Sequence, residues 1–238
     1  MIDEGLGQLS TPEKERVLIT GASRGLGREL SACYAARGAH VLAGVRDPNF
    51  NERLEGVEYF TLDVTDGGSI ENLGQSLQRT AIDIVVNNAA VRGDDGGLDT
   101  LDCDEFLEVM RVNALSALLV TRAVLPFLGR GRRKIVANIS SRAGSMVEGT
   151  IDDDDGDYAY RCSKAALNMV TRKLAHDLKA SGITVISLHP GWVQTDMGGI
   201  HAEVPVSESA AGLMKIIDEI DLSETGSFKS FDGATVAW

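Results

Sequence analysis

The 238-residue sequence is poor in cysteine and in positive charge. Its three cysteines, Cys33, Cys103 and Cys162, are odd in number and widely separated, and they lack C-x-x-C or zinc-site spacing. Lys and Arg together number 23 against 35 Asp and Glu, so the formal net charge is −12. Such a surface repels a phosphate backbone. We therefore expect a reducing compartment, no bound metal and no nucleic-acid partner.

The sequence also lacks a long uninterrupted hydrophobic run. The N-terminus reads MIDEGLGQLSTPEKER, which has no apolar core and excludes an ordinary signal peptide. The most apolar segment, residues 114–128, contains Arg122 and Pro126 and falls short of a membrane span. These features predict a cytoplasmic protein that does not cross a membrane, with residues 1–14 as a flexible extension.

Short β-branched runs alternate with stretches long enough for crossover helices. This alternation predicts an α/β fold with a doubly wound parallel sheet of the Rossmann type, in a single domain spanning residues 1–238. Ligands of such sheets bind beyond the carboxyl ends of the strands, so the loops that follow the strands are expected to carry the function. The expected strands are residues 16–20, 40–45, 57–62, 82–87, 134–140 and 183–188.

The loop after the first expected strand reads TGASRGLG, residues 20–27. It contains G-x-S-x-G around Ser23, the pattern of a hydrolase nucleophile elbow. It equally fits a glycine turn that brings backbone N–H groups against the phosphates of a cofactor. The second interpretation is favoured because it gives Gly27 a task, the close packing of a helix against a strand.

The segment YAYRCSKAALNMV contains a tyrosine and a lysine four residues apart, Tyr160 and Lys164. In the helix predicted for residues 160–170 their Cβ atoms lie about 6 Å apart on one face. A nearby ammonium is expected to lower the pKa of the phenol toward neutrality. A phenol tuned in this way can exchange a proton with a carbonyl oxygen, and Ser141 can polarise that oxygen. An ordinary helix-surface pair is the alternative.

Four motifs resemble the short-chain dehydrogenase/reductase family in their order and spacing over nearly the whole chain. TGASRGLG resembles the TGxxxGxG nucleotide turn, NNAA the NNAG motif, YRCSK the YxxxK motif and HPGWVQTDM the PG…T loop. The segments SSRAGS and YAYRCSKAALNM are most similar to sniffer and C-factor-like carbonyl reductases.

The resemblance implies a role for each of four catalytic residues. Tyr160 would be the acid/base, and Lys164 would lower its pKa and hold the nicotinamide ribose. Ser141 would orient the carbonyl, since Gly144 follows it by three residues as in the family's Ser-x-x-Gly pattern. Asn113 matches the asparagine that bends a helix and holds a water in the proton relay.

The resemblance also implies a dinucleotide site. Arg46 stands at the end of the second expected strand, where NAD-selective members usually carry an acidic residue, and Arg24 adds a second guanidinium. Both favour NADP(H) over NAD. The expected cofactor-binding residues are Gly21, Ser23, Arg24, Gly25, Leu26, Gly27, Arg46, Asp63, Val64, Asn88, Ala89, Tyr160, Lys164, Pro190, Gly191, Val193 and Thr195.

The expected activity is hydride transfer between NADP(H) and a carbonyl or alcohol substrate of small size, EC 1.1.1.-. The sequence does not specify the substrate. A nucleotide-binding signalling protein of the C-factor type is the alternative function. Relatives often form homodimers or homotetramers through two long helices, here near Ala114 and Ala165, but some are monomers.

An acidic stretch, IDDDDGD, precedes Tyr160 and departs from the family pattern. It lengthens the segment between Ser141 and Tyr160, and it fails as a calcium loop because the first and twelfth ligand positions are Ile151 and Cys162. A solvated surface loop over residues 152–157 is expected, and a preference for cationic substrates is a weaker hypothesis.

Overall fold

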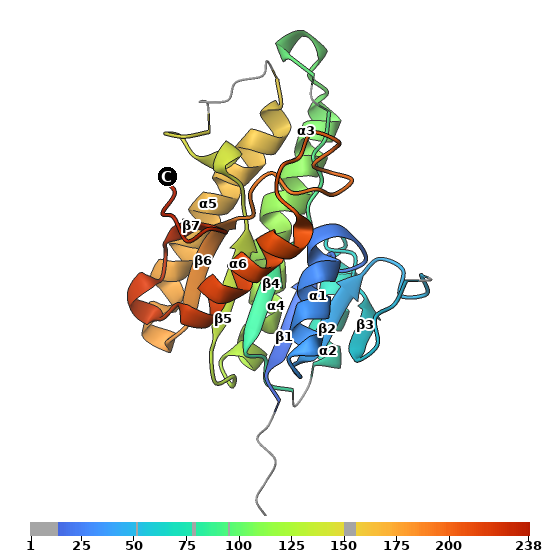
Figure 1. Cartoon of the computed structure of the whole chain (residues 1–238), viewed down its shortest axis with the longest axis vertical. Helices are drawn as coiled ribbons and strands as arrows, with labels where there is room; N and C mark the ends of the chain where they lie inside the picture. The colour runs from blue at the N-terminus through green and yellow to red at the C-terminus, as the bar shows by residue number, and fades with distance from the viewer. Residues whose placement is uncertain (1–13, 51, 78–79, 95, 150–155) are drawn as a thin grey trace, which may run out of the picture.

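The central feature is one sheet of seven parallel strands in the order β3-β2-β1-β4-β5-β6-β7 (Figure 1). The order runs outward from β1 in both directions, which confirms the doubly wound topology. The computed structural model describes residues 14–50, 52–77, 80–94, 96–149 and 156–238. The strands are β1 Arg16–Thr20, β2 His40–Val45, β3 Val57–Thr61, β4 Ile84–Asn87, β5 Ile135–Ile139, β6 Thr184–His189 and β7 Phe228–Ser230.

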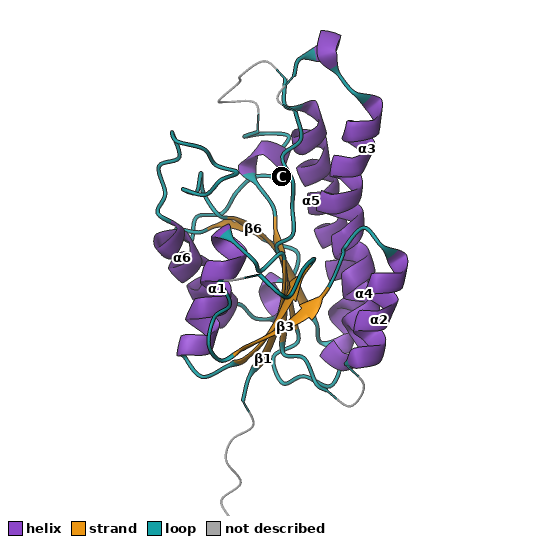
Figure 2. Cartoon of the chain, turned by 90° about the vertical axis from the view of Figure 1, so that its right-hand side faces the viewer, coloured by secondary structure: helices purple, strands orange, loops and turns teal. Residues whose placement is uncertain are grey.

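Helices cover both faces of the sheet (Figure 2). Helices α1 and α6 lie on one face, and α2, α4 and α5 lie on the other. Each face has its own apolar core, with Leu30 and Leu213 fully buried in the first and Val120 and Val124 in the second. The helices are α1 Gly25–Ala36, α2 Gly67–Ser76, α3 Cys103–Met110, α4 Ser116–Leu128, α5 Tyr158–Leu178 and α6 Val206–Glu219.

The expected strands agree with six observed strands to within two residues at each end. The seventh, β7, was missed because it is three residues long with Lys229 at its centre, which gives neither an apolar run nor an alternation. Phe228 is nevertheless 1% exposed, and β7 extends the sheet beyond β6. Residues 1–13 of the expected extension and residues 151–155 of the acidic stretch lie outside the described residues.

Helices α3 and α4 are joined by a π-helical turn, Arg111–Leu115, into one helical run. By length and composition alone the run Cys103–Leu128 could cross a membrane, although residues 114–128 alone are too short. More than half of its most apolar window, 56%, is buried inside the protein. Its buried side chains form the core beside α2 and the sheet, so α4 is a core helix of this fold.

Candidate active site

Helix α5 carries Tyr160 and Lys164 on the face that meets the carboxyl end of β5. Lys164 is 2% exposed, and its Nζ donates a hydrogen bond to the carbonyl oxygen of Ile139 at 2.9 Å. The same Nζ lies 5.4 Å from the centroid of the Tyr160 ring. Burial disfavours the charged form and lowers the pKa of Lys164 to about 8. The two expected partners are therefore adjacent, and the ammonium is held by the end of a core strand.

Hydrogen bonding with the side chain of Ser141 is one of the effects that lower the pKa of Tyr160. The Cζ atom of Arg92 lies 5.6 Å from the centroid of its ring. Burial raises the pKa of the phenol, and this effect outweighs the lowering by the Ser141 bond and by Arg92. The expectation of a lowered phenol pKa is thus wrong for the protein without bound ligands, because desolvation outweighs the nearby positive charge.

Ser141 and Ser140 differ in what holds them. Ser141 caps the short 3₁₀ helix Arg142–Gly144, and its Oγ accepts a hydrogen bond from the Ala143 amide at 3.2 Å. Ser140 is 1% exposed and donates to Oδ1 of Asn168 at 2.6 Å. Ser140 is therefore buried in the core beside α5, whereas Ser141 is partly exposed at the start of the loop after β5.

Asn113 lies in the π-helical turn between α3 and α4, where the regular helix is interrupted. Its Oδ1 accepts from the Val91 amide at 2.8 Å, and its Nδ2 donates to the Val91 carbonyl at 2.8 Å. Nδ2 also donates to Oγ of Ser163, at 2.9 Å, on the same helix as Tyr160. The asparagine therefore ties the loop after β4 to α5 at the point where the regular helix is interrupted.

Two residues beside Tyr160, Asp157 and Arg92, were not predicted as site residues from the sequence. Asp157 is 7% exposed, has φ of 58°, and pairs through Oδ2 with Nη2 of Arg92 at 3.3 Å. Asp157 also lies 4.0 Å from Nε of Arg161. The expectation of a solvated loop is therefore wrong for Asp157, because two arginines offset its burial. An aspartate three residues before the tyrosine was the available signal.

The turn after β1 has the shape expected of a phosphate cradle. Gly21 and Gly25 have φ of 66° and 54°, in the left-handed region that favours glycine. A Cβ at Gly27 would lie 2.4 Å from Nδ2 of Asn88, so only glycine allows this close approach. Helix α1 begins directly after the turn, and the side chain of its N-cap, Arg24, makes no capping bond. Its first-turn N–H groups suit an anion.

The Asn88 side chain braces this cradle. Its Nδ2 donates to the carbonyl oxygens of Thr20 and Gly21 at 3.0 and 3.1 Å. Oγ1 of Thr20 accepts in return from the amides of Asn88 and Ala89 at 3.1 and 3.0 Å. The side chain and the backbone N–H of Asn88 are thus both occupied by the turn.

The loop after β6 lies against the same turn. The Thr195 side chain is 3.3 Å from the position of a Cβ at Gly25, and Gly191 has φ of 80°. Nη1 of Arg24 pairs with Oδ2 of Asp196 at 2.8 Å, with both side chains exposed. The first glycine turn and the PG…T loop, far apart in sequence, are therefore in contact.

The adenosine end of the expected site contains Arg46 and Asp63 at the ends of β2 and β3. Arg46 is exposed, and Asp63 accepts hydrogen bonds from Thr65 that lower its pKa, with a smaller contribution from Arg46. The remaining expected cofactor residues lie in loops at the same edge of the sheet, and those that are buried pack within these loops. The full set of remaining residues is Ser23, Leu26, Val64, Ala89, Pro190 and Val193.

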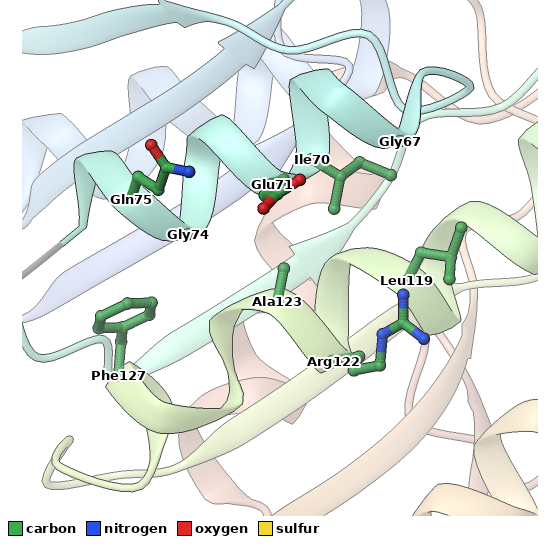
Figure 3. A pocket seen from close by; sticks show the side chains of 9 residues that line it. All are labelled: Gly67, Ile70, Glu71, Gly74, Gln75, Leu119, Arg122, Ala123 and Phe127. Carbon is green, nitrogen blue, oxygen red and sulfur yellow. The ribbon is translucent and has the colours of Figure 1, made fainter.

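A cavity of about 510 Å³ lies between α2 and α4 (Figure 3). Ile70 and Gly74 of α2 face Leu119, Ala123 and Phe127 of α4 across it, and none of its lining residues belongs to the expected site. Among the described residues, no group of three or more His, Cys, Asp or Glu could hold a metal ion.

Fold and site together define a dinucleotide-binding oxidoreductase of the doubly wound α/β class. Residues 15–203 match the family described as short chain dehydrogenase. The chain belongs to this family.

Several relatives and solved structures agree with that assignment. The C-signal of Myxococcus xanthus is 42% identical over 66% of this chain and 93% of its own length. The 1-hydroxy-2-glutathionyl-2-methyl-3-butene dehydrogenase of Rhodococcus sp. (strain AD45) is 34% identical over 93% and 99%. NADPH-bound carbonyl reductase from chicken fatty liver has a TM-score of 0.87 at 31% identity, and carbonyl reductase Sniffer of D. melanogaster has 0.86 at 27%. Both comparisons cover 95% of this chain and all of the other.

Proposed function

We propose that this oxidoreductase is an NADP(H)-dependent carbonyl reductase or alcohol dehydrogenase in which Tyr160 is the acid/base. The observation that carries the proposal is the buried ammonium of Lys164, 5.4 Å from the centroid of the Tyr160 ring, with the side chain of Ser141 near enough to lower the pKa of the phenol. A proton donor, a hydrogen-bonding hydroxyl and a positive charge thereby meet at one point. This set is what protonation of a carbonyl oxygen requires.

The raised pKa of Tyr160 fits a proton donor. A phenol with a pKa above 10 is protonated at neutral pH and gives up its proton only as negative charge develops on the substrate oxygen. Ser141 supplies a hydrogen bond to that oxygen, and Lys164, still largely protonated at pH 7, stabilises the phenolate that remains. Asn113 fixes the loop after β4 relative to α5.

The glycine cradle and the adenosine end fit a dinucleotide. Gly21, Gly25 and the start of α1 would hold its phosphates, and Arg46 a ribose 2′-phosphate. The bound dinucleotide would supply or accept the hydride. NADP rather than NAD is supported by Arg46 and by structural neighbours that bind NADPH or NADP.

For the substrate, the assembly and the location we propose a chemical class, a form of oligomer and a type of compartment. The partner is a small carbonyl or alcohol compound, and a homodimer or homotetramer is one form of assembly. The three free thiols support a reducing compartment such as the cytoplasm. A signalling role like that named for C-signal is the alternative, but it gives the Tyr160, Lys164 and Ser141 arrangement no task.

The test of the proposal is Tyr160→Phe, compared with Tyr158→Phe as a matched control two residues earlier on α5. Removal of the phenolic proton donor should lower kcat/KM on a panel of aldehydes, ketones and quinones by about 10³-fold, while NADPH binding measured by fluorescence changes little. Tyr158 is 43% exposed, and its variant should retain wild-type rates. Full turnover by Tyr160→Phe would contradict the mechanism.

The cofactor preference is tested separately with Arg46→Ala. Loss of a guanidinium from a 2′-phosphate should weaken NADPH binding by about tenfold and leave NADH binding unchanged. Arg53→Ala, in the loop that follows, is the control because its guanidinium lies over the Tyr59 ring at 5.1 Å. Equal effects of Arg46→Ala on both cofactors would overturn the NADP assignment.

A further inference from the structure

The hydroxyl of Ser141 depends on the backbone of the turn that follows it. Its Oγ accepts from the Ala143 amide, and the 3₁₀ helix Arg142–Gly144 starts immediately after it. A Cβ at Gly144 would lie 2.4 Å from the carbonyl carbon of Lys164, so this turn rests directly on α5. Small displacements of the turn therefore move Ser141 relative to Tyr160, and whatever holds the turn controls the catalytic geometry.

From the helix side the turn is held by Asn168. This residue is 4% exposed and stands four and eight positions after Lys164 and Tyr160, on the same face of α5. Its Nδ2 donates to the Gly144 carbonyl at 3.1 Å. Its Oδ1 accepts from the hydroxyls of Ser140 and Ser187 at 2.6 and 3.1 Å.

The orientation of the Asn168 amide is determined by these partners. The Gly144 carbonyl can only accept a hydrogen bond, so it must face the NH₂ group rather than the oxygen. The two serine hydroxyls can donate to the remaining oxygen. Three of the four hydrogen bonds that the amide can form are thus made, and a rotation of the amide would leave buried polar groups unsatisfied.

From the strand side the turn is held by His189, the last residue of β6. Its Nδ1 accepts from the Arg142 amide at 3.3 Å, and its backbone carbonyl accepts from the Phe231 amide at 2.8 Å. Burial, aided by the positive charge of Arg142, lowers the pKa of His189 to about 4. The ring is therefore neutral at physiological pH, with a lone pair free to accept this bond.

We infer that Asn168 and His189 are positioning residues that clamp the Ser141 turn from two sides, and this inference rests on the proposed carbonyl chemistry. Neither residue is placed to meet the reacting atoms; each acts through the backbone of the turn. Asn168 fixes the end of the turn through Gly144, and His189 fixes its start through Arg142. Together they set the distance from the Ser141 hydroxyl to the Tyr160 phenol.

The experiment on the helix side compares Asn168→Ala with Ser187→Ala. Asn168→Ala should lower kcat about 10- to 100-fold, with KM and the NADPH dissociation constant within about threefold of wild type. Ser187→Ala removes a donor to the same amide without touching the turn, and its kcat should stay within about threefold. Equal losses in the two variants would show a general effect on the core and overturn the clamp.

On the strand side the pair is His189→Leu and His189→Asn. Leucine removes the acceptor, whereas the asparagine oxygen can take the place of Nδ1, so His189→Asn should recover most of the kcat that His189→Leu loses. If Asn168→Ala does not fold, this pair decides the question by itself. Identical kcat values for the two His189 variants would refute the proposed contact with Arg142.

A double-mutant cycle with Ser141→Ala separates this inference from the proposed function. If the clamp acts through Ser141, Asn168→Ala should cost less than about threefold in kcat in the Ser141→Ala background. Fully additive losses in an enzyme that still depends on Tyr160 would overturn the clamp alone. Full turnover by Tyr160→Phe would instead overturn the proposed function.

Discussion

The amino and carboxyl edges of the same sheet are built on opposite principles. At the amino edge Arg37 and Arg133 each pair with both Glu15 and Asp218, at N–O distances from 2.6 to 3.1 Å. At the carboxyl edge the buried ammonium of Lys164 is held by one backbone carbonyl, and the phenol of Tyr160 has a raised pKa. The ion pairs of the amino edge stabilise the fold. The carboxyl edge instead holds charge that a bound ligand would compensate.

Asp83 shows how a buried charge at the amino edge is compensated by hydrogen bonds. Its two carboxylate oxygens accept from the amides of Arg16 and Arg132 at 2.9 and 2.7 Å, and it is 4% exposed. Lys164, which is also buried, donates to a backbone carbonyl instead of a carboxylate, and desolvation lowers its pKa. The difference indicates that stability is concentrated at one edge and reactivity at the other.

The largest expected effect is that of Lys164→Met. Loss of the ammonium should lower kcat/KM about 10³-fold, because the phenolate of Tyr160 loses its nearby charge. A pKa of about 8 in place of 10.5 means that the buried charge costs about 3 kcal/mol, so the free energy of unfolding at pH 7 should not fall. Kinetics and urea unfolding measure the two quantities. A loss of stability together with activity would contradict the comparison.

The next effect concerns the pH dependence of stability through His189. With a pKa of about 4 folded and 6.5 unfolded, the unfolded chain binds more protons between these values, so stability rises with pH across that window. The full difference is at most about 3 kcal/mol. Subtracting the curve of His189→Asn removes the carboxylates common to both proteins. The same slope of stability against pH in both proteins would show that the pKa of His189 is not lowered in the folded state. The ring faces Arg142, Asp232 and Glu148.

A smaller effect is expected from Asp83→Asn at the amino edge. Replacing one oxygen by an NH₂ group places a donor against a backbone N–H, which should destabilise the fold by about 2 kcal/mol. The active site lies at the other end of the strands, so kcat/KM should remain within about twofold of wild type. Thermal unfolding and steady-state rates test both parts, and a large kinetic loss would show that the two edges are coupled.

The smallest expected effect is found by comparing the ion pairs of two arginines, Arg24 and Arg37. Arg24→Ala breaks an exposed pair with Asp196 and should change stability by less than about 0.5 kcal/mol. Arg37→Ala removes two partly buried ion pairs and a cation over the Tyr34 ring at 4.3 Å, and should cost about 1–2 kcal/mol. Denaturant midpoints measure both. Equal costs would mean that the amino-edge network is no stronger than a surface pair.

Most of the sheet could be read from the sequence, because strands covered on both faces are short apolar runs and their connecting helices are long. The strand β7 could not be, since three residues with Lys229 in the middle carry no pattern. The neighbourhood of Tyr160 and Lys164 followed from helical spacing, and Ser141 was expected in the loop after a strand and then supported by the family resemblance, whereas Asn113 came from the resemblance alone. The partner of Ser141, the Ala143 amide, is local, whereas the partner of Asn113, Val91, depends on how a distant loop meets the helix.

The sequence by itself determined the order of strands and loops along the chain and the residue types in the loops at the carboxyl edge. Periodicity and turn chemistry are local properties, so they can be read from the sequence. Only the tertiary structure decided which groups lose water and which charges face one another. It reversed the expected shift in the pKa of Tyr160 and buried Asp157 between two arginines. Desolvation and long-range pairing depend on atoms brought together from distant segments, so no local pattern can specify them.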